Sequence, residues 1–328
     1  MNRREAGRAL LSLGTLGLAA RAMVSHAAET YPSKPIKIVV AYAAGTVLDI
    51  WARRVAEKLS KSIGQQVIVE NRPGASGTLG ASAVANSPPD GYTILFGGAT
   101  ELALAPSLFP NLPYKKNKPF EPITRFLSGN SVLVANPALP VANIQDLVAY
   151  GKARPGTLKG GSPGTGTLAH LLLLALNHAT GLEILHVPYK SGTQGLTDVM
   201  AGHIDLMFDW VTSSNAFITA GKLKALLIAG SRRKPLLPNV PAATEFGWKD
   251  LDFGGFNAFL APFGTPKAII YTLHRELLPI LRSKDFEADI ALFGADLVTT
   301  TPDELATFIA SEQKRYKSLV RLTGVKLE

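Results

Sequence analysis

The chain has 328 residues, of which 46% are hydrophobic and 18% are charged, and its formal net charge is +9. This composition is typical of a globular protein with about two domains, so a largely disordered chain is excluded. The sequence contains no cysteine, which excludes disulfides, thiolate metal sites and cysteine nucleophiles.

The first 27 residues have the pattern of a secretory signal peptide. Arg3, Arg4 and Arg8 precede an apolar run from Ala9 to Ala20, and small residues follow at 25–28. An apolar run of about 12 residues is too short to span a bilayer, which needs about 20. We therefore predict a cleavable signal peptide over residues 1–27 and a periplasmic location. The Arg3-Arg4 pair leaves both the Sec and the twin-arginine route open, and an uncleaved membrane anchor is the alternative.

The mature chain shows no pattern for nucleic acid or metal. Without residues 1–27 it keeps 30 basic and 24 acidic residues (34 − 4 and 25 − 1), a net charge of +6. The short basic clusters at 115–118 and 232–234 have no interleaved aromatic residues, so solvated loops are favoured over a nucleic-acid site. His170 and His178 are eight residues apart and offer no set of three or four metal ligands. We predict no metal, no cofactor and no nucleic-acid partner.

Apolar runs of strand length alternate with segments of helical periodicity along the mature chain. In chain order, we predict a strand at 36–40, a helix at 48–63, a strand at 67–69, a helix at 77–86 and a strand at 92–96. After a Pro-rich connection at 106–122 we predict a strand at 132–134, helices at 143–152 and 167–178, a strand at 183–187, a helix at 196–201, and strands at 204–208, 223–229 and 256–260. A helix then begins at Pro266, and a last helix begins at the capping box Thr301 to Glu304. This alternation predicts two α/β lobes, each with a mainly parallel sheet flanked by helices.

Three strand-to-helix loops are rich in Gly, Ala, Ser and Thr. They lie at 41–49, 71–78 and 160–167, and Arg72 is their single cation. Ligands of open parallel sheets bind at the carboxyl ends of the strands, next to helix N-termini. These loops are therefore the candidate ligand site, and the alternative is that they are merely tight turns.

The loop at 160–167 allows two sharper hypotheses, a serine nucleophile and a phosphate-binding loop. Gly160-x-Ser162-x-Gly164 matches a nucleophile elbow, but the next residue should donate its N–H to an oxyanion and Pro163 has none. Gly161-x4-Gly166 lacks the lysine of a phosphate loop, since Thr167 stands in its place. What remains is a neutral set of N–H groups and hydroxyls at a helix N-terminus, which favours a singly charged anion such as a carboxylate.

Motifs along almost the whole mature chain resemble one known family. The matching segments are Tyr31-Pro32-Ser33-Lys34-Pro35-Ile36, Glu70-Asn71-Arg72-Pro73-Gly74-Ala75, Pro88-Pro89-Asp90-Gly91-Tyr92-Thr93, Gly164-x-Gly166-Thr167-x-x-His170-Leu171, Val187-Pro188-Tyr189-Lys190, 201–209 and Pro238-Asn239-Val240-Pro241. They resemble the Bug or TctC family, the periplasmic substrate-binding proteins of tripartite tricarboxylate transporters. The resemblance implies a two-lobed, type II Venus-flytrap fold, with one lobe at 28–128 and 255–328 and the other at 129–254.

The same resemblance implies a site for a small carboxylate between the lobes: a dicarboxylate, tricarboxylate, amino acid or aromatic acid. Family members hold one carboxylate largely through backbone groups and waters of the first two loops. Carried over by position, and completed by Tyr42, Thr46 and Thr100, the predicted site is Tyr42, Ala43, Ala44, Gly45, Thr46, Asp49, Ala75, Ser76, Gly77, Thr78, Thr100, Ser162, Thr165, Thr167, Tyr189 and Asp209.

The sequence departs from the family pattern in places that bear on the ligand. Thr46 follows Gly45 where the family usually has a second glycine, and a proline common after 190–192 is missing. Glu101 follows the third strand and could place an acid in the cleft, which would favour a ligand with an ammonium or hydroxyl group. Trp210 could stack on a flat ligand or belong to the core.

The sequence thus predicts a non-enzymatic, monomeric binding protein that closes on a small carboxylate and delivers it to transporter subunits in the membrane. Closure would be of the hinge type, with the second crossing between lobes near Gly254-Gly255. Two alternatives stay open: a sensor subunit that presents its ligand to a membrane receptor, and a secreted hydrolase that uses Ser162.

Overall fold

The computed structural model describes residues 31–109, 111–114 and 119–325, and the residues from Lys34 onward form one compact unit. The predicted signal peptide lies outside the described residues. Among the residues that are described, no helix combines the length and the apolar character needed to cross a membrane.

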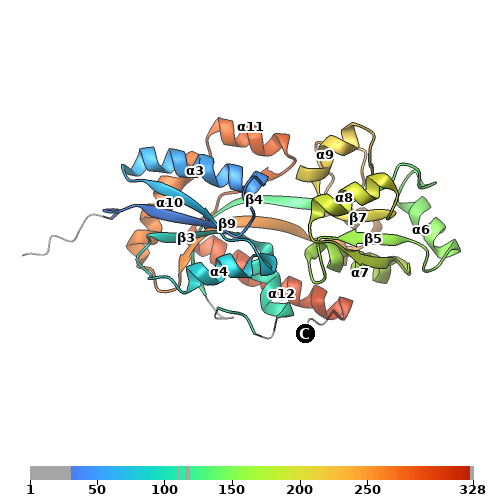
Figure 1. Ribbon diagram of the computed structural model, residues 1–328, viewed down its shortest axis with the longest axis horizontal. Coiled ribbons are helices and arrows are strands. Elements are labelled where there is room, and N and C mark those ends of the chain that lie inside the picture. Colours follow the sequence, from blue (N-terminus) through green and yellow to red (C-terminus); the bar gives the residue numbers. More distant parts are fainter. Residues whose placement is uncertain (1–30, 110, 115–118, 326–328) are drawn as a thin grey trace, which may run out of the picture. The chain divides into compact units, whose positions relative to one another are not determined.

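Ten strands of this unit are hydrogen-bonded in the order β2-β1-β3-β9-β4-β7-β5-β6, with β10 and β8 also pairing with β4. The first part contains the parallel strands β1 (Ile36–Val40), β2 (Val67–Asn71) and β3 (Thr93–Gly98). Helix α3 (Val47–Ile63) lies on one face of these strands and α4 (Thr78–Ala85) on the other, as Figure 1 shows. The predicted strand–helix alternation is confirmed here.

The long strands β4 (Phe120–Ala135) and β9 (Gly254–Pro262) run between the two parts of the sheet (Figure 1). β9 lies antiparallel between β3 and β4, and the β4–β9 pairing ends at Asn130 opposite Gly254. From Ser131 onward β4 instead pairs with β7 (Leu206–Trp210) and β8 (Lys224–Ala229), also antiparallel. We call the paired segments of β4 and β9 the crossing ribbon.

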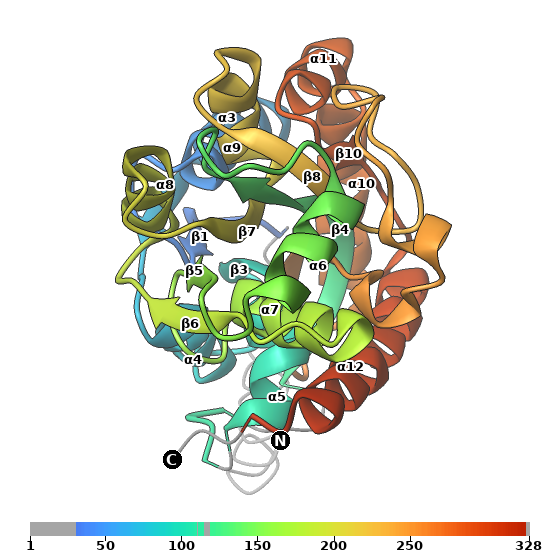
Figure 2. The ribbon, with the colours of Figure 1, turned by 90° about the vertical axis from the view of Figure 1, so that its right-hand side faces the viewer.

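The second part is built around β7, β5 (Lys159–Ser162) and β6 (Leu185–Pro188), which are parallel to one another. Helices α7 (Leu168–Thr180) and α8 (Gly192–Ala201) pack on these strands, and α6 (Ile144–Ala153) lies at the outer end that faces the viewer in Figure 2. The remaining elements are α9 (Val211–Thr219), the short helices η3 (Ala243–Phe246) and η4 (Lys249–Leu251), α10 (Lys267–Leu281), α11 (Lys284–Leu292), β10 (Asp296–Leu297) and α12 (Pro302–Thr323).

Helix boundaries follow the local sequence signals. Thr46 caps α3 by accepting a hydrogen bond from Asp49 N, and Gly64 ends the helix with φ of 67°, a conformation that favours glycine. The predicted capping box of the last helix is confirmed, because Thr301 and Glu304 each accept a hydrogen bond from the other's backbone N–H. On its inner side α3 buries Trp51, which contacts Phe126 edge-on at 5.9 Å.

Two sequence predictions for the middle of the chain are wrong. The connection at 106–122 is not free of regular structure. A π-helical turn, η2 (Thr100–Leu104), continues into α5 (Ala105–Leu108), and β4 already begins at Phe120. β4 has 16 residues, whereas the sequence predicted only 132–134. Its register shifts next to Pro122 and near Arg125 break the alternation that would have indicated one long strand.

Candidate ligand-binding cleft

A cavity of about 460 Å³ opens where the crossing ribbon meets strand ends and helix starts from both parts of the sheet. This volume lies within the range of small-molecule sites. Its lining residues come from the first turns of helices, from the crossing ribbon and from the ends of β3 and β7. They are Tyr42, Thr46, Val47, Leu48, Trp51, Ala99, Thr100, Leu127, Gly129, Pro163, Leu168, Ser191, Gly192, Thr193, Leu196, Asp209, Trp210, Thr212, Ser213, Gly255, Phe256, Asn257 and Ala295.

The N-terminal turns of helices α3, α7, α8 and α9 each contribute residues to the lining of this cavity. The first N–H groups of a helix have no partner within the helix, and the helix dipole makes this end positive. Thr46 and Ser191 cap α3 and α8 through their hydroxyls, but Trp210 provides no side-chain cap for α9. The converging helix ends therefore form a site that attracts an anion.

The cavity carries little formal charge of its own. Among the described residues that line it, none is Lys, Arg or His, and Asp209 is the one acid. The Asp209 carboxylate accepts hydrogen bonds from the hydroxyls of Ser213 and Ser214, the latter at 2.7 Å. Burial raises the pKa of Asp209 despite these hydrogen bonds. An anionic ligand would therefore be held by backbone N–H groups and hydroxyls, not by an ion pair.

The first predicted loop is held by Asp49, which does not line the cavity. Asp49 accepts hydrogen bonds from Gly45 N at 2.9 Å, from Asn71 Nδ2 at 2.9 Å and from Arg53 Nε at 3.1 Å. Burial acts to raise the pKa of Asp49, but these donors outweigh it and hold the pKa below its usual value. The predicted site residues Ala43, Ala44 and Gly45 are exposed and do not line the cavity.

The second predicted loop adopts an unusual backbone conformation. Ala75 and Ser76 have φ values of 44° and 54°, and Gly77 has 85°. The left-handed region is costly for residues other than glycine, and the hydrogen bond from Thr78 Oγ1 to Ala75 O, at 2.7 Å, supports the turn. The four predicted residues 75–78 lie outside the cavity lining.

Ser162 is fully buried beneath the third predicted loop. Its Oγ lies 2.6 Å from His186 Nε2 and donates a hydrogen bond to Gly164 O at 2.9 Å. The His186 ring stacks on that of His170 with 3.8 Å between centroids, and Gly166 N donates to His170 Nδ1. Burial and the neighbouring His186 lower the pKa of His170 to about 4. The Ser162–His186 contact resembles part of a catalytic pair, but a sealed hydroxyl followed by proline cannot attack a substrate.

The remaining predicted residues of the second part also have local partners. Tyr189 donates its hydroxyl to Asp198 Oδ2 at 2.8 Å, and Thr165 is exposed. Thr167 caps α7 by accepting from His170 N, at 3.5 Å. None of these three side chains lines the cavity.

Of the predicted site residues, the structure brings Tyr42, Thr46, Thr100 and Asp209 together around the cavity. Ligand contacts by the other predicted residues stay predictions. Sequence reasoning missed the hydroxyl residues Ser191, Thr193, Thr212 and Ser213, and also Asn257. The first four begin helices directly after β6 and β7, so the strand-end rule could have found them.

Glu101 and Trp210 differ in their relation to the cavity. Glu101 is completely buried and does not line it; one carboxylate oxygen accepts from Gly98 N, and Oε2 has no hydrogen-bond partner. Burial raises the pKa of Glu101 to about 7, and the Glu101 charge contributes, after burial, to raising the pKa of Tyr42. Trp210 lines the cavity, and 38% of its surface is exposed.

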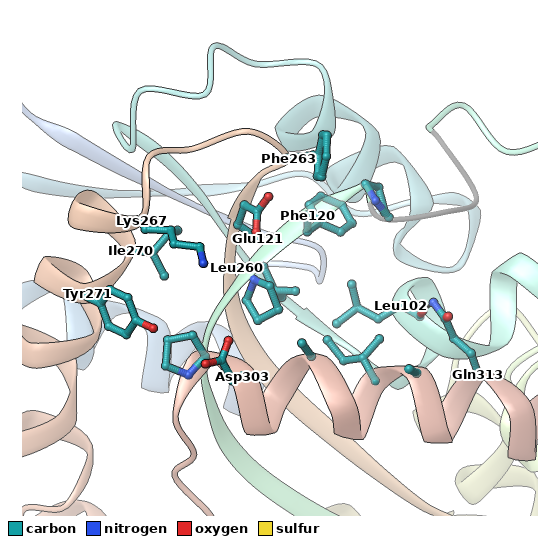
Figure 3. A pocket seen from close by; sticks show the side chains of 16 residues that line it. Leu102, Phe120, Glu121, Leu260, Phe263, Lys267, Ile270, Tyr271, Asp303 and Gln313 are labelled. Carbon is teal, nitrogen blue, oxygen red and sulfur yellow. Dashed lines mark hydrogen bonds between the residues drawn. The ribbon is translucent and has the colours of Figure 1, made fainter.

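A second cavity, of about 320 Å³, lies beside α10 and α12 (Figure 3). Side chains of both charge signs, Glu121, Lys267 and Asp303, surround it together with apolar residues such as Phe120 and Tyr271. Two carboxylates, Glu121 and Asp303, stand against the single cation Lys267 in its lining, so this cavity is less suited to bind an anion than the first. The cleft at the crossing ribbon is the better candidate for a carboxylate.

Comparisons with known proteins show the family of this chain. The model of the "Tripartite tricarboxylate transporter family receptor" family, TctC, matches residues 51–325. The protein BugT of Bordetella pertussis is 36% identical over 96% of this chain and 96% of its own length. An Agrobacterium vitis protein of the same group is 36% identical over 92% of this chain and 86% of its own length.

Solved structures of similar sequence share the fold. The periplasmic binding protein BugD superposes with a TM-score of 0.80 at 33% identity, covering 91% of this chain and all of BugD. An R. palustris protein solved with adipate gives 0.82 at 28% identity, covering 90% of this chain and 99% of that one. MatC from Rhodopseudomonas palustris, solved with bound malate, gives 0.78 at 29% identity, covering 88% of this chain and all of MatC. The fold is the two-lobed one of periplasmic binding proteins, and the family is one of solute-binding proteins, not enzymes. The chain belongs to the TctC, or Bug, family of tripartite tricarboxylate transporter receptors.

Proposed function

We propose that this protein captures a small carboxylate in the cleft and delivers it to the membrane subunits of a tripartite tricarboxylate-type transporter. The observation that carries the proposal is the convergence of four helix N-termini on a cavity whose described lining has no cation. Such a cavity binds an anion through oriented N–H groups. Adipate and malate in two solved relatives support a carboxylate as the anion.

Residues 28–128 and 255–328 form one lobe in this proposal, and residues 129–254 form the other. The change of partners of β4 between Asn130 and Ser131 supports this division. The exported, mature protein acts as a monomer in the periplasm, where the lobes close on the ligand by bending at the crossing ribbon.

A thermal-shift screen of the mature chain against a carboxylate library tests the proposal. A ligand at 100 times its dissociation constant stabilises the native state by about 2.7 kcal/mol, which gives a clear rise in Tm. Nucleotides and neutral sugars serve as controls. A shift with either control class, together with none from any carboxylate, would overturn the proposal.

A further inference from the structure

Trp210 packs against the crossing ribbon at the point where two glycines face each other. Gly129 and Gly255 are directly paired in the β4–β9 register. A Cβ atom added to Gly255 would lie 2.2 Å from Trp210 Cη2, whereas one added to Gly129 would lie 3.8 Å from Cε3. The absence of a side chain at 255 is therefore what allows the indole to reach this position.

The indole forms a flat apolar wall of the cavity. Trp210 is 38% exposed and lines the cavity beside Leu127 of the ribbon. Trp51 of α3 also borders the cavity, but it is 2% exposed and is held edge-on by Phe126 at 5.9 Å and by Phe293 at 5.7 Å, so Trp210 is the accessible aromatic surface. Aromatic rings stack on such surfaces in offset or edge-to-face geometry.

The electrostatics of the cavity limit the charge that a ligand can bring. Each of the four helix N-termini supplies about half a positive charge, about two charges together. When Asp209 is ionised it offsets about one of them, which leaves compensation for about one carboxylate. A second or third carboxylate would be desolvated without an opposite charge, since no Lys, Arg or His is among the described lining residues.

We propose that the ligand is an aromatic monocarboxylate whose ring stacks on Trp210 and whose carboxylate is held by the converging helix N-termini. This inference rests on the proposed function, because it narrows the class of carboxylate that the same cleft binds. Trp210 is then the residue that selects a flat apolar ligand over a short polar acid.

Isothermal titration of the mature protein with a fixed set of acids tests the ligand class. The probes are benzoate and phenylacetate as aromatic monocarboxylates, hexanoate as an aliphatic one, and succinate, malate and citrate as acids with several carboxylates. Aromatic acids should bind up to about tenfold more tightly than the others, the gain expected from an aromatic pair beyond its buried area. Binding of malate or citrate as tight as that of benzoate overturns this inference but leaves the proposed function intact. Failure of every carboxylate to bind overturns both.

Substitutions around the indole test its role with matched controls. Trp210→Ala should weaken benzoate binding about tenfold while changing hexanoate binding less, so the selectivity itself falls. Gly255→Ala should have the same direction of effect because its new Cβ displaces the ring. Trp248 is the control for fluorescence, because it stacks on Phe246 at 4.8 Å and is absent from the cavity lining.

Benzoate should quench the tryptophan emission of the wild type and of Trp248→Phe, but much less that of Trp210→Phe. If Trp210→Ala and Gly255→Ala both keep the wild-type ratio of benzoate to hexanoate affinity, the ring does not lie on Trp210 and the inference is wrong.

Discussion

Glu101 shows how a single buried acid can oppose stability at neutral pH. Gly77 and Gly97 leave room for its carboxyl group: Cβ atoms added there would lie 3.0 Å from Oε2 and 2.8 Å from Oε1. Burial disfavours a charge in this place more than the backbone N–H groups of Glu101 and Gly98 and the Tyr42 side chain favour it, and Oε2 has no hydrogen-bond partner. The protonated form is therefore the stable one in the folded protein.

This burial predicts a defined pH dependence of stability for Glu101. The folded pKa of about 7 is raised from 4.5, so the folded state holds a proton that the unfolded state releases between these values. The contribution of Glu101 to the free energy of unfolding is thus full below about pH 4.5 and is lost as pH rises through about 7, by roughly 3 kcal/mol. Glu101→Gln keeps an acceptor for Gly98 N and removes the titration.

Urea unfolding of wild type and Glu101→Gln at pH 5 and pH 8 measures the effect. The variant should gain stability relative to the wild type between the two pH values. An equal difference at both pH values would show that Glu101 is ionised throughout.

At the scale of elements, the N-terminal caps of α3 and α12 allow an effect on protein stability to be distinguished from an effect on ligand binding. Both helices begin with a threonine whose hydroxyl accepts a backbone N–H, but Thr46 lines the cleft and Thr301 does not. Thr46→Ala and Thr301→Ala should each lower the free energy of unfolding by about 1 kcal/mol.

Only Thr46→Ala should also weaken carboxylate binding. The Thr46 hydroxyl donates a hydrogen bond to Ala43 O and so holds in place a loop that adjoins the cavity. Chemical denaturation gives the first quantity and calorimetric titration the second. If the two variants change carboxylate binding equally, the N-terminus of α3 is not part of the binding site.

Elements with regular periodicity were predictable from the sequence, and those shaped by distant contacts were not. α3 shows one apolar stripe between Thr46 and Gly64, and the structure has it at 47–63. β4 was missed for most of its length, because its partner β9 lies more than a hundred residues later and its register shifts twice. Likewise, position next to a strand end and the family resemblance indicated Tyr42, Thr46, Thr100 and Asp209, but nothing local marks Asn257 or Leu127, which reach the cavity through strand pairing.

At the scale of the whole molecule, the proposed closure of the lobes predicts a distance change that labels can follow. The chain has no cysteine, so introduced cysteines carry spin labels without background. Ile50 lies on exposed α3 surface in one proposed lobe, and Lys190 is exposed in the other. Saturating ligand should shorten the distance between labels at Ile50→Cys and Lys190→Cys.

Labels at Ile50→Cys and Glu287→Cys, both in the first lobe, are the control pair and should keep their distance. Distances between the labels, measured by pulsed electron paramagnetic resonance before and after ligand addition, test the proposed closure. An unchanged distance across the cleft, with ligand bound, would contradict hinge closure.

The place of β9 in the sheet also has a consequence for the order in which the chain can assemble. β9 is the inner neighbour of both β3 and β4, yet it follows the whole of β5 to β8 in sequence. Until residues 254–262 have been synthesised, β3 and β4 have no strand between them, and the sheet of the first lobe stays divided. The inserted segment 131–229 already contains β5 to β8 and the end of β4, and it can pair within itself. In the proposed division, the lobe that begins first along the chain is therefore completed last, and such distant pairing slows folding.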